Sequence, residues 1–160
     1  MAQSGQDFLL IVDVQAAFRP RPDIVAGLAA LAQRLSAAAT IELHNENRTP
    51  FARQLGWKPA VEDHCMIEGV PVFVKHGYLP PDDLIAHIHA KSPARVLVGG
   101  VQADTCVMAA GFRLFDEGLH PTMLAPLCQG SSADPDGQIA RRLWKHHFGA
   151  IIEKLNELPL

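Results

Sequence analysis

Short apolar runs alternate with amphipathic segments along this chain, and this alternation is the strongest constraint on its fold. The first run, residues 8–14, is apolar everywhere except at Asp13, which is typical of a strand covered on both faces. Apolar residues then recur at helical spacing, at Ile24, Leu28, Leu31 and Leu35. A doubly covered strand followed by an amphipathic helix predicts a parallel sheet with helices packed against it.

The alternation continues to the end of the chain. Further strands are expected over 40–44, 70–75, 96–101, 121–125 and 150–152, and further helices over 81–89, 104–117 and 136–147. Parallel neighbours require right-handed crossovers, and 160 residues suit one domain with a single core. We therefore predict one α/β domain over residues 1–160, a three-layer α/β/α sandwich with a mostly parallel, doubly wound, Rossmann-like sheet. Residues 45–65 are polar and long for a connection, which indicates a functional loop or lid.

Composition argues against several classes of function. The net charge is −3 without a basic run, so we expect no nucleic-acid partner and no binding to a membrane surface. No apolar stretch is long enough to span a bilayer, and residues 1–7 do not resemble a signal peptide. The three cysteines, Cys65, Cys106 and Cys128, form neither a CxxC pair nor a zinc-binding pattern. A cytoplasmic protein with free thiols is expected.

Cys106 is the residue most indicative of chemistry. It follows the expected strand 96–101 and falls in the first turn of the next helix, where unpaired N–H groups and the helix dipole favour a thiolate. The carboxyl ends of strands are also where α/β folds place their reactive groups. Taken alone, Cys106 is explained equally simply as a buried structural cysteine.

Two further strand ends carry charged side chains, Asp13 on the first strand and Lys75 on the strand 70–75. In a parallel sheet these ends meet at one edge, and a buried charge is costly unless it is paired. An ammonium lowers the pKa of a thiol, and a carboxylate can hold the thiol proton. Asp13 could instead cap a turn and Lys75 could be solvated, but the three together favour a catalytic set of Asp13, Lys75 and Cys106.

These residues resemble the isochorismatase-like cysteine hydrolases, which include nicotinamidases and N-carbamoylsarcosine amidases. The resemblance rests on an Asp-x-Gln with a following aromatic residue at 13–18, a strand-end lysine within 72–78, and a Gly-Val-x-x-Asp-x-Cys-Val segment at 100–107. It spans nearly the whole chain and implies the isochorismatase-like hydrolase fold. It also implies a hydrolase of the amidase type, acting on a small-molecule amide or related non-peptide C–N bond.

The resemblance also implies the roles of individual residues. Cys106 would be the nucleophile that forms a thioester, Asp13 the general base and acid, and Lys75 the charge partner. A non-proline cis peptide is implied at Val101–Gln102, and the N–H groups of Gln102 and Cys106 would form the oxyanion hole. No cofactor is implied.

One segment departs from the nicotinamidase pattern. Nicotinamidases carry an Asp-x-His-x-x-x-His metal site, whereas this chain has Glu42, His44 and Arg48 at the matching positions. The carboxylate is longer, and an arginine repels a metal. The Asn45…Thr49-Pro50-Phe51 pattern resembles metal-free members, so we predict no metal, with His44 a candidate to face the pocket.

Four residues are candidates to bind the substrate: Gln15, Phe18, Trp57 and Tyr78. Trp57 could equally anchor its loop to the core or to a subunit interface. Cys65 and Cys128 are expected to have no role in the reaction, and a homo-oligomer is expected for a fold of this size.

Two other functions stay open: a catalytically diverged binding or regulatory protein, and a thiol redox protein, although Cys106 has no nearby resolving cysteine in the sequence.

Overall fold

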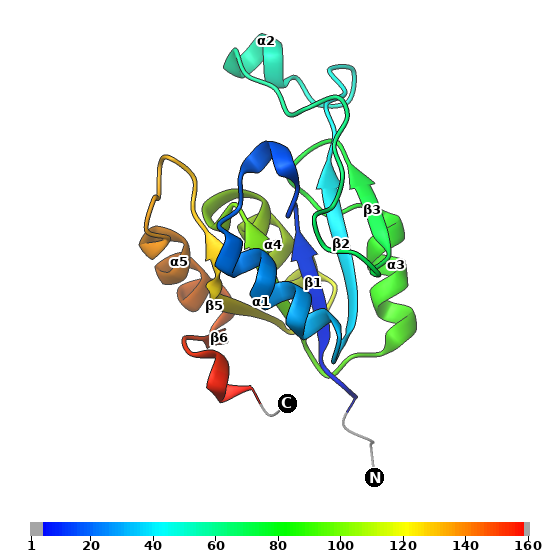
Figure 1. Ribbon diagram of the computed structural model, residues 1–160, viewed down its shortest axis with the longest axis vertical. Helices are drawn as coiled ribbons and strands as arrows, with labels where there is room; N and C mark the ends of the chain where they lie inside the picture. Colours follow the sequence, from blue (N-terminus) through cyan, green and yellow to red (C-terminus); the bar gives the residue numbers. More distant parts are fainter. Residues whose placement is uncertain (1–4, 159–160) are drawn as a thin grey trace.

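Six strands form one parallel sheet in the computed structural model, which describes residues 5–158 (Figure 1). The spatial order is β3-β2-β1-β4-β5-β6, and every neighbouring pair is parallel. The strands are β1 (Phe8–Val12), β2 (Ser36–Glu42), β3 (Val72–Lys75), β4 (Val96–Val101), β5 (Pro121–Gln129) and β6 (Ile151–Ile152). The predicted parallel α/β architecture is confirmed. β3 begins only after Pro71, and β2 and β5 are longer than predicted.

Helices cover both faces of the sheet, and Figure 1 shows α1 in front of it and α4 behind. On one face of the sheet, α1 packs against Leu9, Ile11 and Leu97. On the other face, the remaining long helices form a core that contains Leu10 and Val98. The helices are α1 (Pro22–Ala32), α2 (Phe51–Leu55), α3 (Asp82–Lys91), α4 (Met108–Asp116) and α5 (Gln138–Phe148). None of the helices within residues 5–158 has the length and apolar character that crossing a membrane requires.

The strand order places a switch point between β1 and β4. The chain leaves β1 through α1 toward β2, and it leaves β4 through α4 in the opposite direction, toward β5. Crossovers that diverge in this way open a crevice at the carboxyl ends of the two strands. Asp13 directly follows β1, and a π-helical turn, Ala103–Val107, follows β4. The expected helix 104–117 therefore begins with this wider turn and continues as α4.

Gly100 allows β4 to approach β1 closely at this point. Its φ is 127°, and a Cβ atom built there would collide with the carbonyl oxygen of Val12. Only glycine combines that backbone conformation with so short a distance to the neighbouring strand. The turn that carries Cys106 is thereby held against the end of β1.

The long connection between β2 and β3 stands beyond the carboxyl edge of the sheet, with α2 at its tip (Figure 1). It is otherwise irregular, as expected for residues 45–65. Its return half is tied to the body: Met66 N donates to Val14 O at 2.8 Å, and buried Ile67 packs in the α1-side core. The segment is therefore placed over the strand ends that carry the charged residues.

Candidate active site

The ends of three strands bring Asp13, Lys75 and Cys106 into contact. Lys75 Nζ lies 2.8 Å from Asp13 Oδ2 and donates to Cys106 Sγ at 3.2 Å. Asp13, Lys75 and Cys106 are only 0%, 3% and 5% exposed, so these polar groups interact with little screening by water. The three residues selected from the sequence thus form one buried cluster around the lysine nitrogen.

The backbone turns sharply at Asp13 to aim its carboxylate at Lys75. Asp13 has a φ of 51°, a left-handed conformation that aspartate tolerates better than most residues. Its N–H donates to the carbonyl of Thr40 at 3.1 Å, and its Oδ1 accepts from the Thr40 hydroxyl at 2.7 Å. Thr40, which looks like an ordinary strand residue in the sequence, therefore fixes the second oxygen of the carboxylate.

Lys75 is held as an ammonium by its neighbours. Nζ also donates to the carbonyl of Gly77 at 2.8 Å. Burial by itself would lower the pKa of Lys75, but the charge of Asp13, joined by Cys106 and Glu42 where these ionise, outweighs it and raises that pKa above its ordinary value. The cation is therefore permanent at physiological pH.

Cys106 rests as a neutral thiol, contrary to the expectation from its place at a helix start. Burial raises the pKa of Cys106 well above its ordinary value, Asp13 raises it further, and Lys75 offsets only part of this. Lys75 acts in the expected direction, but desolvation is the larger effect. A nucleophilic role for this thiol would therefore require a base that accepts its proton.

Glu42, the last residue of β2, is the site residue that sequence reasoning missed. It is 2% exposed, and its Oε2 lies 3.7 Å from Lys75 Nζ and accepts from Cys106 Sγ at 3.6 Å. Burial raises the pKa of Glu42 to about 7, Lys75 opposes this rise, and Asp13 adds to it. The sequence offered one sign of this: a carboxylate at a strand end beside the strand that carries Lys75.

The acidic cluster does not fit a metal ion. Ligand atoms of Asp13, Glu42 and Cys106 lie within 4.8 Å of one another, but the ammonium of Lys75 already lies among them. His44 does not join Glu42: its Nε2 lies 3.3 Å from Glu46 Oε2. Arg48 lines a hollow that Lys75 and Tyr78 also line. Among residues 5–158, the possible ligands that gather here are Asp13, Glu42 and Cys106, and His44 is not one of them.

The turn after β4 contains the expected cis peptide. The peptide bond between Val101 and Gln102 is cis, and Gln102 and Cys106 both line the same cavity. Asp104 anchors the turn because its carboxylate accepts from the N–H and the hydroxyl of Ser131, at 2.8 and 2.6 Å. That contact explains the aspartate two residues before the cysteine.

A cavity of about 80 Å³ opens onto Cys106. Three of the four expected substrate-binding residues contribute to it; its lining residues are Phe18, Glu42, Trp57, Tyr78, Val101, Gln102, Thr105 and Cys106. Gln15 does not line this cavity. Its amide nitrogen donates to the Glu42 carbonyl and to Asp63 Oδ2, at 2.9 and 3.0 Å, and its oxygen accepts from Glu42 N at 2.7 Å. Gln15 therefore fixes the backbone of Glu42.

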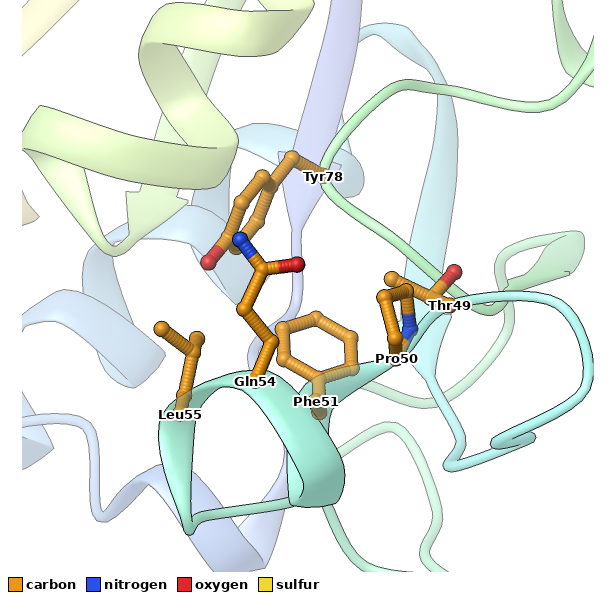
Figure 2. Close-up of a pocket in the computed structure, with 6 residues that line it drawn as sticks. All are labelled: Thr49, Pro50, Phe51, Gln54, Leu55 and Tyr78. Carbon is orange, nitrogen blue, oxygen red and sulfur yellow. The ribbon is translucent and has the colours of Figure 1, made fainter.

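The α2 segment supports the aromatic wall of this cavity. A neighbouring hollow has a volume of about 160 Å³. Figure 2 shows the side chains that line it: Thr49, Pro50, Phe51, Gln54, Leu55 and Tyr78. The buried ring of Phe51 meets Trp57 and Tyr78 edge to face, with centroids 5.6 and 5.5 Å away. Trp57 therefore lines the cavity and packs on Phe51, a residue of its own connection.

This chain is similar to known proteins in its three-dimensional structure. No family model matches the chain, and no curated protein is significantly similar to it in sequence. A pyrazinamidase/nicotinamidase from Streptococcus mutans is 18% identical with a TM-score of 0.76, over 92% of this chain and 100% of that chain. An N-carbamoylsarcosine amidase from Thermoplasma acidophilum is 17% identical with a TM-score of 0.79, over 97% and 99%.

A cysteine hydrolase from Pseudomonas syringae also has this fold, at 14% identity and a TM-score of 0.71 over 91% of this chain and 87% of that chain. At such identities the similarity shows the fold alone. The expected isochorismatase-like fold is therefore confirmed.

Proposed function

We propose that this protein is a cysteine hydrolase that cleaves a small amide or a related non-peptide C–N bond through a thioester on Cys106. One observation carries the proposal: Lys75 Nζ lies within hydrogen-bond distance of both Asp13 Oδ2 and Cys106 Sγ, beside a cavity that Cys106 lines. The fold shared with amidases supports it. A neutral thiol flanked by a paired carboxylate suits nucleophilic attack on a carbonyl.

The reaction begins with transfer of the Cys106 proton to Asp13 as the sulfur bonds to the substrate carbonyl carbon. The resulting oxyanion accepts hydrogen bonds from the N–H groups of Gln102 and Cys106. Lys75 balances the negative charge of the centre throughout. In the simplest scheme, Asp13 returns the proton to the leaving nitrogen, the C–N bond breaks, and a water activated by Asp13 then hydrolyses the thioester.

The size of the cavity points to a small substrate. About 80 Å³ is well below the roughly 300–1,000 Å³ that drug-sized ligands occupy. Phe18, Trp57 and Tyr78 supply apolar faces, so a short or flat acyl group is the best match for this cavity. Self-association and a cytoplasmic location remain predictions from the sequence.

Turnover and the mass of the Cys106 peptide test the proposal together. The protein is incubated with acetamide, nicotinamide, pyrazinamide and N-carbamoylsarcosine, and ammonia release is measured. We expect turnover of at least one amide and its loss in Cys106→Ala and Asp13→Asn, because the nucleophile or its base is removed. Cys65→Ala, which alters a cysteine outside the cavity lining, is the matched control and should stay active. Absence of both turnover and an acyl adduct would favour a binding or regulatory protein.

A further inference from the structure

We infer that Glu42 is a second acid of the catalytic centre, which protonates the leaving nitrogen while Asp13 accepts the thiol proton. This inference rests on the proposed amide hydrolysis and deepens it. It divides the proton transfers between two carboxylates, so that the thiol and the leaving group are each served by a different residue.

The two carboxylates differ in their access to a substrate. Glu42 lines the cavity onto which Cys106 opens, whereas Asp13 is not among its lining residues. Asp13 Oδ1 accepts from the Thr40 hydroxyl, and Oδ2 forms a 2.8 Å ion pair with Lys75 Nζ. Glu42 Oε2 contacts Cys106 and Lys75, but Oε1 is buried and has no hydrogen-bond partner among residues 5–158. A buried, unpartnered oxygen is the atom left for a substrate group.

The charges of the cluster assign the resting protons. Three acidic groups, Asp13, Glu42 and Cys106, surround one ammonium, and all four groups are at most 5% exposed. One cation balances one anion, and Asp13 makes the shorter contact with Lys75, 2.8 Å against 3.7 Å for Glu42. Asp13 therefore carries the negative charge, while Glu42 and Cys106 keep their protons, since an unbalanced buried charge is costly.

The ionisation of Glu42 supports this assignment. Burial raises the pKa of Glu42 to about 7, so about half of the molecules carry this proton at pH 7, and the group can readily give it up. The titratable groups that change the pKa of Glu42 are Lys75, Asp13 and Cys106. The phenol of Tyr78 is also close enough to interact with Glu42, and it stays neutral because burial raises the pKa of Tyr78.

The proton transfers then balance over one turnover. In acylation, the thiol proton passes to Asp13 as the C–S bond forms, and the Glu42 proton passes to nitrogen as the C–N bond breaks. In deacylation, the Glu42 carboxylate takes a proton from water as the water oxygen bonds to the carbonyl carbon. The C–S bond then breaks, the product leaves as a carboxylic acid, and the thiolate recovers its proton from Asp13.

Substitution of Glu42 separates leaving groups that need a proton from those that do not. Glu42→Gln keeps the shape of the side chain but cannot donate an acidic proton, and Glu68→Gln, at an exposed glutamate of the same connection, is the matched control. We expect Glu42→Gln to lower kcat for the amides that the wild type cleaves by roughly 10²–10³-fold. The burst of nitrophenolate from p-nitrophenyl acetate should stay at the wild-type level, because this leaving group departs without a proton.

Two further readouts distinguish a proton donor from a structural residue. After the burst, Glu42→Gln should accumulate acetylated Cys106, because the base for deacylation is missing. In the wild type, kcat/KM for an amide should fall as pH rises past about 7, the pKa of Glu42, and this decline should be absent from the residual activity of Glu42→Gln. Thermal unfolding of both variants checks that the fold is retained.

The outcomes separate the two proposals. Full amide turnover by Glu42→Gln, or an equal loss of amide turnover and ester burst in a folded variant, would overturn the role of Glu42 and leave the hydrolase proposal standing. A wild-type protein that forms no acyl-Cys106 with any probe would overturn the hydrolase proposal, and the role of Glu42 with it.

Discussion

Lys75 Nζ reaches across β2 to lie 2.8 Å from Asp13 Oδ2, so that a buried ion pair joins the ends of β3 and β1. Glu42 pairs in register with Lys75 on the intervening strand, which places the second carboxylate beside the same ammonium. The site is therefore a cluster in which each charge depends on the others. Four predictions follow from its contacts and those of its wall.

Lys75→Met should destabilise the fold and abolish turnover. Removing one member of a buried ion pair leaves the other uncompensated, at a cost of about 3–5 kcal/mol. The loss of stability should be larger at pH 8 than at pH 5, because at low pH the carboxylates left without the ammonium take up protons and lose their charge. Urea unfolding at the two pH values measures this loss. Lys91→Met, at an exposed lysine, should cost less than about 1 kcal/mol; an equal loss in the two variants would contradict the prediction.

Glu42→Gln should change how stability depends on pH. The pKa of Glu42 rises from its ordinary value of 4.5 to about 7 on folding. Between these values the unfolded chain has released the proton that the folded chain keeps, so stability falls as pH rises from about 4.5 to 7. Wild-type protein should therefore lose at most about 3 kcal/mol relative to Glu42→Gln over this interval. Urea unfolding at several pH values measures the free energy of unfolding of both proteins. The same dependence on pH in the two proteins would refute this prediction.

Alkylation of Cys106 by iodoacetamide should be slow at neutral pH and should accelerate in alkali, because burial and Asp13 raise the pKa of Cys106. Glu42→Gln should speed the reaction above pH 7, where it removes a negative charge beside the sulfur, and should leave it unchanged near pH 5. Mass spectrometry of the Cys106 peptide follows the reaction. Cys128, whose pKa burial raises to about 12, serves as an internal control. Fast modification of Cys106 at pH 6 would argue against a neutral thiol.

Phe51→Ala should weaken both the fold and the aromatic wall. Phe51 is 2% exposed and supports the rings of Trp57 and Tyr78, so its loss should cost about 3–5 kcal/mol. Because those two rings line the cavity, KM for a cleaved amide should rise more than kcat falls. Phe115→Ala, at a residue that is 54% exposed, is the matched control and should leave KM unchanged. A KM that stays constant in Phe51→Ala would show that the wall does not depend on Phe51.

The parallel α/β fold and the cluster of Asp13, Lys75 and Cys106 were predictable from the sequence. Apolar periodicity is local, and the rule that parallel strands end at one edge places strand-end residues together without further information. The cis peptide at Val101–Gln102 was expected only from the resemblance to known hydrolases. The bounds of β2, β3 and β5 depended on sheet pairing and differed from those predicted.

The contacts of Glu42 and Gln15 could not be predicted, for a common reason. Their roles depend on which backbone lies beside them: Glu42 faces Lys75 through the register of β2 and β3, and Gln15 reaches the backbone of Glu42 and the carboxylate of Asp63. Neither relationship has a sequence spacing that could reveal it. The Cys106 thiol was likewise expected to ionise from its local position, whereas burial by distant segments controls its pKa.

By itself, then, the sequence determined the order of the elements, the shared edge, and which carboxylate, ammonium and thiol meet there, because these follow from local periodicity and strand ends. Tertiary structure alone decided the protonation of the site and the place of Glu42 in it. Ionisation depends on the sum of burial and neighbouring charges, which segments far apart along the chain create together.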